Sequence, residues 1–173
     1  MKIDFKQIDY LKEGNEKQQR LYNVLNSSKI LVIVQNYQPI VVGTIPIEID
    51  IETSDVDIIL KSDDFYETYK VLTESFSNYK NFKIDISTNN VILCNFELDN
   101  FLFEIYVSTI ETTKQNAYLH MIKEYEILQI ENNSFKNRII QLKKEGIKTE
   151  PAFCKLLNIE GNPYIELLNY QPK

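Results

Sequence analysis

The sequence predicts an α+β protein in which a small mixed or antiparallel sheet is flanked by helices and followed by a helical C-terminal part. Apolar, β-branched runs gather between residues 39 and 107, and helical periodicity dominates on both sides of them. The 173-residue chain has only four glycines and five prolines, which leaves no linker-like stretch. We therefore expect one domain over residues 1–173, with helices and sheet core in 1–111 and a helical part in 112–173.

The N-terminal third has the apolar spacing of helices. We expect helices over residues 4–12, 16–25 and 27–36, with a break at Gly14-Asn15 and a cap at Ser27 or Ser28. Pro39 then opens the first strand, which runs to Gly43. The segment that follows, residues 45–51, alternates apolar and acidic residues as a strand does.

The middle of the chain is predicted to form most of the sheet. Strands are expected over residues 55–60, 82–87, 91–98 and 101–107, and a helix capped by Ser62-Asp63-Asp64 is expected to run to about residue 79. Asn89-Asn90 and Asp99-Asn100 are compact turns, so the last three strands should form an antiparallel meander beside residues 55–60.

The C-terminal part is predicted to be helical over residues 113–130, 134–144 and 149–158, with a last turn opened by Asn162-Pro163. His120, the only histidine, is expected to lie outside the core stripe of the first of these helices. Asn116, His120 and Lys123 should share a neighbouring face, where an amide, an imidazole and an ammonium could meet phosphate or base. An ordinary boundary histidine is the alternative.

Two carboxylates carry the strongest chemical signal. Asp55 and Asp57 are one residue apart at the start of a β-rich run, so they project from one face of a strand, where they can hold a divalent metal. Upstream, the small residues Gly43-Thr44 end the first strand and offer amides and a hydroxyl to phosphate oxygens. Both features also have a purely local explanation, because Ser54 or Asp55 can cap turn amides and Gly43 suits a tight turn.

These residues resemble the signature of the nucleotidyltransferase superfamily of polymerase-beta type. Val42-Gly43-Thr44 is followed by a spacer, residues 45–54, and then by Asp55-Val56-Asp57-Ile58. Thr44 replaces the usual serine, and the strand-like spacer departs from the helix that the superfamily commonly begins there. From the segment at Tyr10 to the one ending at Phe153, the chain also resembles a small bacterial nucleotidyltransferase-like family catalogued as a domain of unknown function.

The resemblance implies a metal-dependent nucleotidyltransferase that moves a nucleoside monophosphate from an NTP, with ATP as first candidate, to an acceptor hydroxyl. Asp55 and Asp57 would hold Mg²⁺ or Mn²⁺, and Glu104 would complete the site or activate the acceptor. The remaining predicted substrate-binding residues are Gly43, Thr44, Ser54, Asn116, His120 and Lys123. Glu104 interrupts an apolar run, where a charge is costly unless it meets a cation or a donor; an edge-strand carboxylate facing water is the alternative.

A second function class remains open at this point. The strand-like spacer, and the absence of an obvious basic clamp for a triphosphate, favour a catalytically inactive ligand-binding or regulatory protein, similar to toxin–antitoxin members of the superfamily. The spacer acids Glu48, Asp50 and Glu52 are interpreted as a solvated strand face rather than as extra ligands.

Charge and hydropathy limit the partners. A net charge of −6 and a pI near 4.9 argue against nucleic acid, whose affinity comes from clustered Lys and Arg. No apolar run approaches the roughly 20 residues of a membrane span, and the N-terminal residues lack the apolar segment of a secretory signal. We therefore expect a cytoplasmic protein without a membrane partner, in which Cys94 and Cys154 serve core packing.

Overall fold

The computed structural model describes residues 3–87 and 90–171. Its helices, in chain order, are η1 (Asp9–Glu13), α1 (Glu16–Ser28), α2 (Ile30–Ile33), η2 (Gln35–Tyr37), α3 (Phe65–Phe76), η3 (Thr112–Lys114), α4 (Asn116–Ile130), α5 (Asn133–Lys144), α6 (Thr149–Leu157) and α7 (Pro163–Asn169), the η elements being 3-10 helices. Its strands are β1 (Ile40–Val42), β2 (Val56–Lys61), β3 (Lys80–Ser87), β4 (Val91–Leu98) and β5 (Phe101–Ser108). The predicted α+β class is confirmed.

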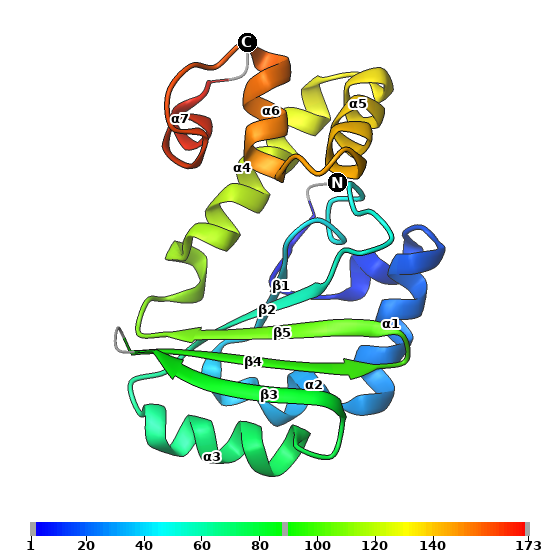
Figure 1. Cartoon of the computed structure of the whole chain (residues 1–173). Coiled ribbons are helices and arrows are strands. Elements are labelled where there is room, and N and C mark those ends of the chain that lie inside the picture. Colours follow the sequence, from blue (N-terminus) through cyan, green and yellow to red (C-terminus); the bar gives the residue numbers. More distant parts are fainter. Residues whose placement is uncertain (1–2, 88–89, 172–173) are drawn as a thin grey trace.

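The strands form a five-stranded mixed sheet in the order β1-β2-β5-β4-β3 (Figure 1). β2 and β5 pair in parallel, and every other neighbouring pair is antiparallel. The predicted meander of β3, β4 and β5 is therefore confirmed, with β5 as the strand beside β2. Asp99 and Asn100 both have positive φ in the β4–β5 turn, whereas Asn89 of the other predicted turn lies outside the described residues.

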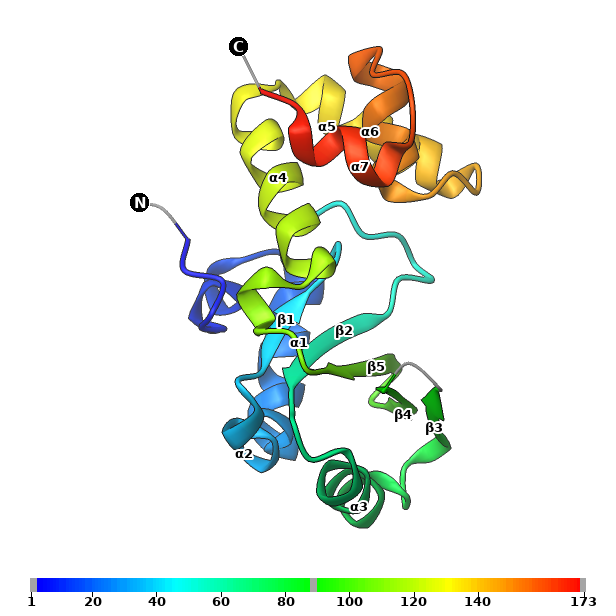
Figure 2. The same ribbon diagram turned by 90° about the vertical axis from the view of Figure 1, so that its left-hand side faces the viewer.

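Alternation along β2 and β5 gives the sheet two different faces. Val56, Ile58 and Leu60 belong to a hydrophobic cluster with residues of α1, α2 and α3. Ile59, with Ile40 of β1, belongs instead to a cluster with residues of α4 to α7. Figure 2 shows α4 rising from the sheet toward α5, α6 and α7, on the opposite side from α3. Residues of β2 at odd positions therefore face the C-terminal helices.

The bounds of the N-terminal helices differ from the predicted ones. Residues 4–12 form turns and then the 3-10 helix η1, in place of an α-helix. The Asn15 side chain begins α1 with a reciprocal capping box, because it accepts from Gln18 N while Gln18 accepts from Asn15 N, each at 3.0 Å. The expected helix 27–36 is divided, since α1 continues to Ser28 and Lys29 adopts a left-handed φ of 57° before α2.

The predicted strand in the spacer is wrong, because residues 45–48 form a turn. Glu48 N donates to Ile45 O at 3.2 Å, and Glu48 has a positive φ of 59°. The three isoleucines of this segment are buried in two different clusters: Ile45 lies in the cluster with α1 to α3, whereas Ile47 and Ile49 lie in the cluster with α4 to α7. The apolar residues therefore alternate because the segment contacts both clusters. The acids form no strand face either: Glu48 pairs with Lys136 and Asp50 with Lys17.

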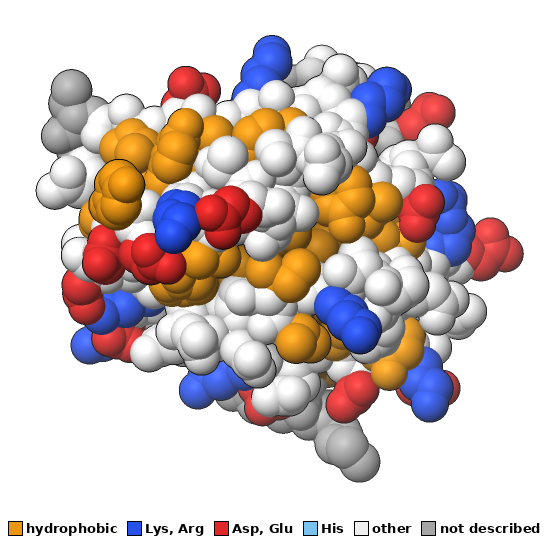
Figure 3. Space-filling view, turned by 90° about the horizontal axis from the view of Figure 1, so that it is seen from below, with side chains coloured by type: hydrophobic (Ala, Val, Ile, Leu, Met, Phe, Trp, Pro, Cys, Tyr) orange, Lys and Arg blue, Asp and Glu red, His pale blue; other side chains and the backbone are white. Residues whose placement is uncertain are grey.

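The surface below the sheet, over α2 and α3, mixes hydrophobic side chains with lysines, arginines and acids (Figure 3). Val32, Ile33 and Tyr66 of these two helices are exposed. Cys94 and Cys154 are buried free thiols, as predicted. Among the described residues, none of the helices combines the length and the apolar character that a membrane span requires.

Candidate active site

The strand register brings the predicted carboxylates together. Asp57 of β2 lies opposite Glu104 of the parallel strand β5 and opposite Val42 of the antiparallel strand β1. Asp55 precedes β2 and lies two positions before Asp57, so by strand alternation it faces the same side of the sheet. That side is the one that the C-terminal helices face.

Gly43 allows the chain after β1 to pass directly against Asp57. Its φ is +83°, a conformation that L side chains rarely adopt, and a Cβ at this position would collide with the Asp57 carboxylate. The glycine is therefore required by both the backbone and the close approach to the acid.

Replacement of Gly43 by alanine is expected to destabilise the protein by about 1–2 kcal/mol, because it adds a strained φ and displaces Asp57. Chemical denaturation of the metal-free protein measures the loss. Gly146→Ala is the matched control, since Gly146 also has a positive φ of 89° but has nothing within 4 Å of the added Cβ. Equal losses in the two variants would contradict a special role for the Gly43–Asp57 contact.

Thr44 and Ser54 connect the two ends of the spacer. Their hydroxyl oxygens are 3.3 Å apart, and Ser54 Oγ also accepts from the amide of Ile51 at 2.9 Å. Both residues line a cavity beside Asp55. They therefore hold the loop in shape and still offer hydroxyl oxygens to a ligand in that cavity.

Two cavities meet at Asp57. The smaller, of about 340 Å³, is lined by Glu104, Tyr106, Ser108, Lys114, Asn116 and further residues of β2 and the β5–α4 connection. The larger, of about 590 Å³, is lined by Gly43, Thr44, Ser54, Asp55, Lys143, Lys144, Lys148 and neighbouring residues of α4 to α6. Val42, Asp57 and Ala117 line both. Asp55 thus lines only the larger cavity and Glu104 only the smaller one.

The carboxylates are in an environment that favours a cation. Burial, and then the charges of Asp55 and Glu104, raise the pKa of Asp57 to about 7. Burial and Asp55 also raise the pKa of Glu104. Within residues 3–87 and 90–171, no lysine, arginine or histidine forms an ion pair with these three acids. Three oxygen donors of this kind, without a paired base, fit Mg²⁺ or Mn²⁺.

The lysines of the larger cavity were not identified from the sequence. Lys143 and Lys144 end α5, and Lys148 precedes α6, so only the fold brings them near Asp55. Lys143 is buried, donates to the backbone oxygen of Ile49 at 2.7 Å, and has its pKa lowered by burial to about 8. A basic last turn of a helix is an ordinary feature, and it gave no signal of a site.

The expected polar face of α4 is not formed. Asn116 lines the smaller cavity, but His120 is only 6% exposed, so its predicted place outside the core stripe is wrong. Lys123 lines neither cavity, because its Nζ donates to the backbone oxygen of Tyr170 at 2.9 Å. The chain around α7 packs against this side of α4, which covers Lys123. Ala117 of the same helix is exposed and lines both cavities.

A family model described as a domain of unknown function, DUF4269, matches residues 23–170. No curated protein is significantly similar to the chain.

Several solved structures share the fold. A mutant of the Cid1 poly(U) polymerase bound to MgATP has a TM-score of 0.61 and 11% identity, over 87% of this chain and 53% of that one. Cid1 with MgGTP gives 0.55 and 10%, over 79% and 46%. The GLD-2/RNP-8 complex gives 0.52 and 13%, over 86% and 60%. The chain thus spans about half the length of Cid1, and its sheet and helices have the nucleotidyltransferase fold.

Proposed function

The chain belongs to the DUF4269 family, and we propose that it is a metal-dependent nucleotidyltransferase that moves a nucleoside monophosphate from an NTP to an acceptor hydroxyl. The observation that carries the proposal is the place of Asp57, where the two cavities meet. One cavity contains Asp55 and the other Glu104. A donor nucleotide and an acceptor can therefore reach the same carboxylate from different directions.

Asp55 and Asp57 are the proposed metal ligands, and Glu104 is the third carboxylate of the site. Bound Mg²⁺ or Mn²⁺ would neutralise phosphate charge and orient the α-phosphate. The raised pKa of Asp57 supports this assignment, since a cation would relieve the repulsion that causes part of the shift. In the structurally similar Cid1 structures, Mg accompanies ATP and GTP.

The larger cavity is the proposed triphosphate site. Lys144 and Lys148 supply positive charge on one wall, and Gly43-Thr44 with Ser54 supplies small polar groups on the other. These lysines provide the basic wall that the sequence did not reveal. Together with the turn at residues 45–48, they support the active alternative over an inactive protein.

The smaller cavity is the proposed acceptor site, because Glu104 lines it and the larger cavity does not reach Glu104. Glu104 would take the proton of the acceptor hydroxyl, and its raised pKa suits a general base. The acceptor oxygen then forms a bond to the α-phosphorus, the bond to the bridging oxygen breaks, and pyrophosphate leaves. Lys114 and Asn116 lie on the same wall and would orient the acceptor.

Nucleotide binding is tested by thermal stabilisation with ATP, GTP, CTP and UTP, with and without Mn²⁺. We expect at least one NTP to raise Tm in the presence of Mn²⁺, and we expect the double variant Asp55→Asn, Asp57→Asn to lose this shift. Glu52→Gln is the control, because Glu52 is exposed and lines neither cavity.

An equal shift in the double variant would contradict the assignment of the metal ligands. No shift with any NTP would favour the second function class, in which the fold serves ligand binding or regulation without turnover.

A further inference from the structure

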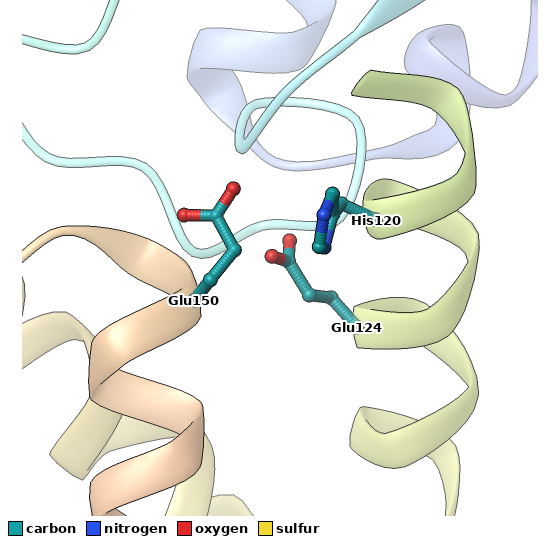
Figure 4. Close-up of side chains that lie close together, drawn as sticks. All are labelled: His120, Glu124 and Glu150. Atoms are coloured by element: carbon teal, nitrogen blue, oxygen red, sulfur yellow. The ribbon is translucent and has the colours of Figure 1, made fainter. Parts of the chain in front are cut away.

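A second group of metal-type ligands lies apart from the acidic strand. His120 and Glu124 of α4 and Glu150 of α6 each offer a ligand atom, and these atoms all lie within 4.8 Å of one another. Figure 4 shows the three side chains converging between the two helices. His120 and Glu124 are one helical turn apart, so they project from one face of α4.

The cluster is buried and not satisfied by protein partners. His120 is 6% and Glu124 4% exposed, whereas Glu150 is half-buried. His120 Nδ1 is a buried atom with no hydrogen-bond partner among the described residues. Within residues 3–87 and 90–171, no ion pair or hydrogen bond joins His120 to Glu124 or Glu150. Burying an imidazole nitrogen without a partner is costly, and a metal ion bound at Nδ1 would offset that cost.

We propose that His120, Glu124 and Glu150 bind a transition-metal ion of the Zn²⁺ or Mn²⁺ class, at a site separate from Asp55 and Asp57. Two ligands on one zinc ion lie at most about 4.2 Å apart, twice a metal–ligand distance of about 2.1 Å. The ligand atoms of the cluster all lie within 4.8 Å of one another, which is close to that limit. An imidazole ligand favours Zn²⁺ over Mg²⁺, which prefers oxygen.

Charges around the cluster also favour a cation. Burial, and then Glu150, raise the pKa of Glu124 well above its usual range, while Lys143 opposes this shift. Lys143 itself uses its ammonium to hold the backbone of Ile49, at 2.7 Å. The ring of Tyr164 from α7 lies edge-on to His120, with centroids 6.4 Å apart.

The site would connect the C-terminal helices to the wall of the larger cavity. Glu124 and Glu150 both line that cavity, and they come from α4 and α6 respectively. A metal at this position would join the two helices and offset the negative charge of their carboxylates on the wall that the proposed triphosphate faces. Its binding does not depend on the proposed transferase function, because it uses none of the strand acids.

Zinc titration of the tag-free, EDTA-treated chain tests the proposal by calorimetry. We expect one Zn²⁺ equivalent to be lost in Glu150→Gln, which removes the least buried ligand, and in His120→Ala. The double variant Asp55→Asn, Asp57→Asn should retain this equivalent. Glu126→Gln is the control, because Glu126 lies on α4 outside the cluster. Unchanged stoichiometry and affinity in Glu150→Gln would overturn the proposal.

A spectroscopic measurement identifies the ligand without a destabilising variant. Because the chain contains one histidine, protein labelled with ¹⁵N-histidine and loaded with Mn²⁺ should show a nitrogen hyperfine coupling that can come only from His120. We expect this coupling to persist in the Asp55→Asn, Asp57→Asn variant and to disappear in Glu150→Gln. Bound Mn²⁺ without any histidine coupling would overturn the site. Loss of the coupling only in the strand variant would overturn it too, because His120 would then share its ion with the strand acids and not with Glu150.

Discussion

Asparagine in place of Asp57 is expected to abolish nucleotidyl transfer, lowering kcat/KM by at least about 10³-fold. Asp57 lies between Val42 and Glu104 in the sheet and is shared by both cavities, so its carboxylate is the one that would face donor and acceptor together. The amide keeps the shape of the side chain but removes the charge that a metal requires. Pyrophosphate release, with the NTP identified by thermal stabilisation, measures the loss.

The control for this experiment is Glu52→Gln, which removes one exposed acid of the loop before β2 and should leave turnover unchanged. Circular dichroism should show the same fold in both variants, because the Asp57 side chain forms no hydrogen bond or ion pair with a described residue, and its backbone pairing in the sheet is unchanged. Turnover retained by Asp57→Asn would refute the proposed mechanism. A nucleotide-dependent shift without pyrophosphate release in the native chain would instead favour a binding protein.

Local pattern was sufficient to predict the positions of most strands of the sheet. β2, β4 and β5 each combine β-branched or aromatic residues with clear boundaries, and the Asp99-Asn100 turn fixes the register of the last two strands. The position of Glu104 beside Asp57 followed from the resemblance rather than from local pattern. Parallel pairing of β2 with β5 depends on contacts distant in sequence.

Residues governed by tertiary contacts were not predictable in the same way. The alternation at Ile45, Ile47 and Ile49 is typical of a strand. These side chains instead enter the two cores from the turn at residues 45–48 and from the residue that follows it, and this segment is not part of the sheet. His120 is buried because α6 and α7 approach α4, and its own helix does not encode that approach. The lysines of the larger cavity, at the end of α5 and before α6, likewise reach Asp55 only through tertiary packing.

The difference in stability between Asp57→Asn and the native chain is expected to depend on pH in the absence of metal. The carboxyl of Asp57 has a pKa of about 7 in the folded protein and an ordinary value of 3.8, so the folded state binds the extra proton between these values. The contribution of this carboxyl to the stability of the folded protein is therefore fully present below about pH 4, and it is lost as the pH rises through 7. Asparagine does not titrate, so the variant should become the more stable protein as the pH rises from 5 to 8, by about 2–4 kcal/mol.

Denaturant unfolding at several pH values, with EDTA, measures this difference, and the comparison cancels the titration of groups common to both proteins. Mg²⁺ or Mn²⁺ should remove the advantage of the variant at pH 8, because a cation that binds the ionised acids stabilises only the native chain. At pH 5, where the folded protein carries a protonated Asp57, the metal should have less effect. A stability difference that stays constant from pH 5 to 8 would show that Asp57 is not held against Asp55 and Glu104 in the manner described. If the stability difference varies with pH but neither metal changes it, the three acids repel one another as described. They would then not be metal ligands.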